Sequence, residues 1–112
     1  MSSFKAGRLG EDIMRELTAI FRELKDPRID PMISIVKVDL SNDLSHCKVY
    51  VSCLEGIEKA KESVKGLKSA SGFIKRELFH RLKIRKSPEL HFIADDSIEQ
   101  SAELNKKLGE LL

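Results

Sequence analysis

The sequence predicts an α+β fold in which helices pack on one face of a three-stranded sheet. Its 112 residues suit one compact domain spanning residues 1–112. Hydrophobic residues make up 41% and charged residues 34%, a balance typical of globular proteins. Segments with helical and strand periodicity follow in the order helix, strand, strand, helix, bent helix, strand, helix. Three strands cannot bury both faces of a sheet, so we expect one face to stay partly wet.

The first helix is predicted from apolar residues that repeat every three or four positions and so fall on one stripe. They are Leu9, Ile13, Leu17, Ile20, Phe21 and Leu24. The residue before a proline is pushed out of the helical region, so Lys25-Asp26-Pro27 should end the helix near Leu24.

Two strands follow. Residues 32–40 are rich in β-branched side chains and alternate from Val36 to Leu40, and residues 46–54 carry apolar side chains at every second position from Cys47 to Cys53. The short turn-forming segment Ser41-Asn42-Asp43 between them predicts an antiparallel hairpin.

A bent pair of helices is predicted next. The helical period runs from Glu58 to Leu82, interrupted by Ala70-Ser71-Gly72. A glycine within a helix costs about 1 kcal/mol relative to alanine, so the tripeptide predicts two helices that meet at a bend. We expect a β-branched residue at Gly72 to disturb this bend.

A third short strand is predicted at Glu89 to Ala94, and the preceding helical crossover favours parallel pairing with an earlier strand. The capping-box pattern Ser97-Ile98-Glu99-Gln100 then predicts a last helix. Its apolar side comprises Ile98, Ala102, Leu108 and Leu111.

Candidates for catalysis or metal binding are sparse. They are His46, His80, His91, Cys47 and Cys53. The histidines are scattered over different elements, and the cysteines fit no metal or redox spacing and are expected to be small buried hydrophobes. Asp95-Asp96 precedes a predicted helix, where the helix dipole favours carboxylates. The sequence therefore predicts no enzyme, no cofactor and no metal site.

The net charge of +2 conceals a strongly basic stretch. Residues 59–86 hold 10 Lys and Arg against 2 Asp and Glu, whereas the segments before and after carry net charges of −2 and −4. With only two acids in the stretch, salt bridges cannot account for so many bases. Such a concentration attracts a polyanion, and exposed amides at the bend can admit a phosphate.

Nearly the whole chain resembles the bacterial ribosome-binding factor A family. The matching segments are Asp26-Pro27-Arg28-Ile29, Val36-Lys37-Val38, Asn42-Asp43-Leu44, Lys48-Val49-Tyr50-Val51-Ser52, Ile84-Arg85-Lys86-Ser87-Pro88-Glu89-Leu90-His91-Phe92 and Asp95-Asp96-Ser97. Ala70-Ser71-Gly72 stands where other KH domains have a GxxG loop. The resemblance implies a type II KH-like fold.

The resemblance also implies a ribosome assembly factor. It would bind the free small ribosomal subunit and its rRNA, assist late maturation of that RNA including the 5′ end, and support growth in the cold. A partner such as an assembly GTPase would release it. The RNA-binding residues expected on this basis are Lys65, Lys68, Ala70, Ser71, Gly72, Lys75, Arg76, Arg81, Lys83, Arg85 and Lys86. Because most phenylalanines fit the core pattern, phosphate contacts should dominate over base stacking.

An alternative is a protein-interaction domain that docks an acidic partner through its basic helices. The start of the chain lacks an apolar signal stretch, and no apolar run approaches the roughly 20 residues that cross a bilayer, so we expect a cytoplasmic protein. No heptad seam demands a dimer, which favours a monomer. Replacing Lys75, Arg76 and Arg81 by glutamate is expected to weaken RNA binding without lowering stability, because these side chains fall off the apolar stripe.

Overall fold

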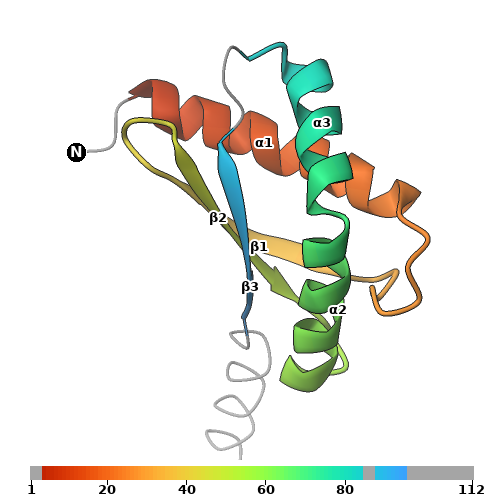
Figure 1. Ribbon diagram of the computed structural model, residues 1–112. Helices are drawn as coiled ribbons and strands as arrows, with labels where there is room; N and C mark the ends of the chain where they lie inside the picture. The colour runs from red at the N-terminus through yellow and green to blue at the C-terminus, as the bar shows by residue number, and fades with distance from the viewer. Residues whose placement is uncertain (1–3, 85–87, 96–112) are drawn as a thin grey trace, which may run out of the picture.

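The computed structural model describes residues 4–84 and 88–95, and its elements follow the predicted order (Figure 1). They are α1 (Phe4–Glu23), β1 (Ser34–Leu40), β2 (His46–Ser52), α2 (Ile57–Ser69), α3 (Ser71–Leu82) and β3 (Glu89–Ala94). The predicted last helix, which would begin near Ser97, lies outside the described residues, as do Asp96, Arg85 and Lys86. No helix in the described ranges is long and apolar enough to cross a membrane.

The three strands form one sheet in the order β1-β2-β3. β1 and β2 are antiparallel, with Val38 opposite Val49, and β2 and β3 are parallel, with Val49 opposite Phe92. The register between β1 and β2 shifts between Ile35 and Lys37, which is the geometry of a β-bulge. The predicted hairpin and the parallel third strand are therefore confirmed.

The helices cover one face of the sheet, as predicted (Figure 1). Along β2 the side chains alternate between the core, which receives Cys47, Val49 and Val51, and the open face, which carries His46 and Lys48. The largest fully buried side chains of the helices are Ile13, Leu17, Ile20, Leu67, Ile74 and Leu78. Full burial of each such side chain contributes about 1.5–3 kcal/mol, so this one-sided core is the main source of stability.

Both cysteines belong to this core, as expected from their alternation with polar residues. Burial raises the pKa of the Cys47 thiol to about 12 and also raises that of Cys53. A thiol that stays protonated at neutral pH is a poor nucleophile and a poor metal ligand. The cysteines therefore act as small apolar side chains.

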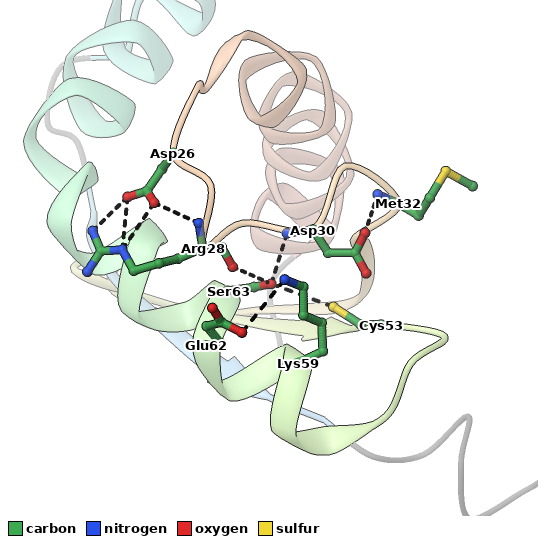
Figure 2. A network of polar contacts seen from close by, with 8 residues as sticks. All are labelled: Asp26, Arg28, Asp30, Met32, Cys53, Lys59, Glu62 and Ser63. Carbon is green, nitrogen blue, oxygen red and sulfur yellow. Dashed lines mark hydrogen bonds and ion pairs between the residues drawn. The ribbon is translucent and has the colours of Figure 1, made fainter.

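The connection between α1 and β1 is fastened to α2 by a polar network (Figure 2). The backbone N–H of Asp30 donates to the hydroxyl of Ser63 over 3.1 Å, and that hydroxyl donates to the carbonyl oxygen of Arg28 over 3.3 Å. The Arg28 guanidinium lies 2.6 Å from the Asp26 carboxylate. These hydrogen bonds, first from the Arg28 side chain and then from its backbone N–H, lower the pKa of Asp26 to about 2.

Gly66 lets the same connection approach α2 closely. A Cβ at this position would lie 2.7 Å from Cγ1 of Ile29 and 3.3 Å from the Asp26 carboxylate. Ile29 is buried and β-branched, so it has little freedom to move aside. The close contact between helix and loop therefore requires glycine at position 66.

Candidate nucleic-acid interface

The predicted bend between the two basic helices lies at Ala70. This residue ends α2 and begins α3, with φ −93° and ψ 7°. Its N–H donates to the carbonyl oxygen of Gly66 over 3.1 Å, and its own carbonyl accepts the N–H of Ile74 over 2.9 Å. No side chain caps α3, so the amides of its first turn, which begins at Ser71, can receive an anion.

Gly72 does not make the bend. It is the second residue of α3, its φ is not positive, and a Cβ built there would meet no atom within 4 Å. The structure therefore gives no steric reason for a β-branched residue at Gly72 to disturb the bend, because a Cβ there would extend into open space. The glycine that matters for packing is Gly66, which the sequence pattern did not single out.

Four of the predicted RNA-binding cations are exposed and form no ion pair with any residue that the structure describes. They are Lys65, Lys68, Arg76 and Lys83. Lys65 and Lys68 lie on α2, Arg76 lies on α3, and Lys83 ends α3 in the left-handed conformation (φ 51°, ψ 38°). These cations flank the bend on both sides and are available to phosphates.

Two other predicted cations are held by carboxylates from distant parts of the chain. Lys75 lies 3.1 Å from Glu89 of β3. Arg81 lies 2.8 Å from Glu23 and 3.7 Å from Glu16, both on α1. The hydrogen bond from Lys75 lowers the pKa of Glu89, and the hydrogen bond to Glu23 raises the pKa of Arg81.

The argument that salt bridges cannot account for the basic stretch is therefore wrong for Lys75 and Arg81. Counting acids within residues 59–86 misses those that the fold brings from α1 and β3. The triple glutamate substitution would also place negative charge beside these carboxylates at two positions. These ion pairs lead us to expect that the triple variant is less stable than the unsubstituted chain. Arg76 is the one member of the trio without such a partner among the described residues.

Two aromatic residues on α3 lie at the surface, although the sequence pattern led us to expect most phenylalanines in the core. Phe73 is 42% exposed and Phe79 is 40% exposed, whereas Phe21 and Phe92 are buried. The sequence already indicated this exposure. Ile74 and Leu78, four residues apart, form the buried face of α3, and the two phenylalanines lie one position away from them. The expectation that most phenylalanines belong to the core is wrong for these two.

The histidines are less scattered than the sequence suggested. His46 on β2 and His91 on β3 meet on the open face of the sheet, with Nδ1 of the first 3.1 Å from Nε2 of the second. Within the described ranges, no group of three or more histidine, cysteine, aspartate or glutamate side chains could hold a metal ion. Cys47 points to the other face of the sheet, so it cannot join this pair.

A family model, a relative in sequence and a solved structure all match this chain to the same protein family. A model of the ribosome-binding factor A family matches residues 5–108. The chain is 45% identical over 113 residues to ribosome-binding factor A of Clostridium tetani, covering 99% of this chain and 93% of that relative. The crystal structure of ribosome-binding factor A from Thermus thermophilus matches with a TM-score of 0.71 and 27% identity, over 80% of this chain and 93% of that one.

A second structural match concerns a ribosome complex. A homology model of the Thermus thermophilus ribosome binding factor A, fitted into a cryo-electron microscopy map of its complex with 30S, matches with a TM-score of 0.65 and 29% identity. The match covers 77% of this chain and 90% of that one.

Proposed function

The chain belongs to the ribosome-binding factor A family, and on that premise we propose that it binds the small ribosomal subunit through the cations of α2 and α3. The observation that carries the proposal is the group Lys65, Lys68, Arg76 and Lys83, which flanks the bend without carboxylate partners among the described residues. Together with the uncapped amides at the start of α3, these side chains can bind phosphates. A 30S complex of a Thermus thermophilus relative supports the choice of partner.

The mechanism that we propose is steric and electrostatic. The protein acts as a single-domain monomer in the cytoplasm. It contacts the phosphates of folded rRNA and holds one conformation of the neck region of the small subunit until assembly of the subunit finishes. In this way it assists late maturation of the RNA, including its 5′ end, and supports growth in the cold. Release follows the action of an assembly GTPase. Nothing in this mechanism requires a catalytic residue or a cofactor.

The test is co-sedimentation with immature and mature small subunits over a series of salt concentrations. Four phosphate contacts predict a slope of about −3 to −4 in a plot of log affinity against log salt. The double variants Lys65→Glu/Lys68→Glu and Arg76→Glu/Lys83→Glu should each weaken binding and make the slope shallower by about 2. The matched control is Lys37→Glu/Lys48→Glu, which makes the same charge change at exposed positions of β1 and β2, on the sheet face that the helices leave open.

Preferential, salt-dependent binding to the subunit that only the α2 and α3 variants weaken would support the proposal. Binding to neither particle, or binding indifferent to salt, would refute it and favour docking of an acidic protein. Equal loss in the control variant would mean that total charge, rather than this surface, governs association.

A further inference from the structure

The outward face of α3 combines aromatic rings with cations. Phe73 and Phe79 are 42% and 40% exposed, while Ile74 and Leu78 on the same helix are fully buried. Single exposed apolar residues are ordinary on protein surfaces. Here two large rings occur on one helix face together with an exposed arginine, and core packing does not explain their position.

The spacing of these residues places the arginine between the rings. An α-helix turns about 100° and rises about 1.5 Å per residue, so Phe73 and Phe79, three residues before and after Arg76, lie about 60° to either side of it. Along the helix axis the two phenylalanines are about 9 Å apart. The ring of His80 meets that of Phe79 edge-on, with centroids 5.9 Å apart, so one side of Phe79 is supported by a neighbour.

The charge of this face selects an anionic occupant. Arg76 and Lys83 are exposed and form no ion pair with a described residue. Glu77, the carboxylate within α3, is half-buried and acts on Arg81, which faces α1. An occupant that suits both the cations and the rings must carry negative charge together with flat apolar groups.

We propose that the outward face of α3 binds unpaired nucleotides of RNA, with bases stacked on Phe73 and Phe79 and phosphates held by Arg76 and Lys83. This inference rests on the proposed function and specifies the kind of RNA segment that the basic surface recognises. Bases inside a duplex stack on each other at about 3.4 Å and present no free face, whereas loops, bulges and ends do. An acidic protein surface would satisfy the cations but would give the exposed rings no equivalent flat partner.

The experiment compares the affinity of the full chain for an unpaired RNA of about 12 nucleotides with its affinity for a duplex of the same length. Phe73→Ala and Phe79→Ala should each lower the affinity for the unpaired RNA about 5- to 150-fold, which is the range of one base-aromatic stack. The affinity for the duplex and the salt slope should not change, because no charge is removed. Phe73→Trp and Phe79→Trp should retain binding.

Leu54→Ala is the matched control, because Leu54 is 76% exposed and lies outside α2 and α3. It should leave both affinities unchanged. All these positions are at the surface, so the thermal midpoint of each variant should stay near that of the unsubstituted chain, which separates lost binding from lost folding.

Three results would overturn the inference. The first is equal affinity of the unsubstituted chain for both probes, or no binding of either. The second is equal loss of both affinities in the alanine variants. The third is that the alanine variants bind the unpaired RNA as the unsubstituted chain does but no longer bind the small subunit. That result would mean that Phe73 and Phe79 contact a ribosomal protein. In each case the proposed function stands if the unsubstituted chain still co-sediments with the subunit in a salt-dependent way, and it fails independently if that binding is absent.

Discussion

Adding one methyl group at Gly66 tests how the connection between α1 and β1 holds α2. In Gly66→Ala the new Cβ would lie 2.7 Å from Cγ1 of Ile29, closer than non-bonded carbons approach, and 3.3 Å from the Asp26 carboxylate. Ile29 is 7% exposed and β-branched, so its side chain has little freedom to move aside and we expect the loop to shift.

Three contributions set the change in the free energy of unfolding, two unfavourable and one favourable. Overpacking in a close-packed site costs about 1–3 kcal/mol. Alanine is favoured over glycine within a helix by about 1 kcal/mol. Moving the loop also weakens the hydrogen bonds that join it to Ser63, each worth about 0.5–1.5 kcal/mol. With the two hydrogen bonds weakened rather than lost, the sum is a loss of about 1–3 kcal/mol, which lowers Tm by about 4–13 °C in a chain of this size.

Gly72→Ala is the matched control, because it makes the same chemical change in the neighbouring helix. A Cβ there meets nothing within 4 Å, so only the gain in helix propensity remains, and we expect stability to rise by about 0.5–1 kcal/mol. Urea unfolding followed by circular dichroism measures both variants. A Gly66→Ala protein as stable as the unsubstituted chain would refute the close-contact argument, and a destabilised Gly72→Ala protein would refute the account of the bend.

Three further predictions concern charged and buried polar groups. Arg81→Glu should lower Tm because it faces two glutamates of α1, whereas Arg76→Glu should change stability by less than about 0.5 kcal/mol; thermal melts of both decide this. Ser63→Ala should cost about 1–3 kcal/mol in urea unfolding, because it leaves a buried N–H and a carbonyl without their partner. The pKa of Asp26 is lowered in the folded state from 3.8 to about 2 by hydrogen bonds from Arg28, so its stabilising effect is complete above about pH 4 and is lost as pH falls to about 2. Thermal melts between about pH 4 and about pH 2 should show a larger fall in Tm for the unsubstituted chain than for the Asp26→Asn variant.

The order and type of the described elements could be predicted from the sequence because each has a strong local signal. Apolar residues repeat every two positions in the strands and every three to four positions in the helices, and Pro27 marks the end of α1. The parallel pairing of β3 followed from the helical crossover alone. The bulge between Ile35 and Lys37 had no comparable signal, because it depends on how β1 meets β2 rather than on either strand.

The site was predicted less completely because pairing between charges is a property of the fold. Arg81 and its partner Glu23 are 58 positions apart in the chain, so no local count of acids and bases could join them. Gly72 drew attention by its place in a basic stretch, but the steric role belongs to Gly66, and only the position of Ile29 shows it. The exposed rings of Phe73 and Phe79 were within reach of sequence reasoning, since residues one position from a buried stripe need not be buried.

The basic stretch therefore contains two kinds of cation with different relations to RNA. Lys75 and Arg81 fasten α3 to β3 and α1, so a phosphate could recruit them only by displacing a carboxylate. The four cations Lys65, Lys68, Arg76 and Lys83 have no such competitor among the described residues and can take phosphates while the helices stay in place. The salt slope distinguishes the two cases, because adding both paired cations to the four unpaired ones would steepen it to about −4 to −5. A slope of about −3 to −4 would mean that the ion pairs persist in the complex, and that the bend of α2 and α3 is presented to RNA as a preformed surface.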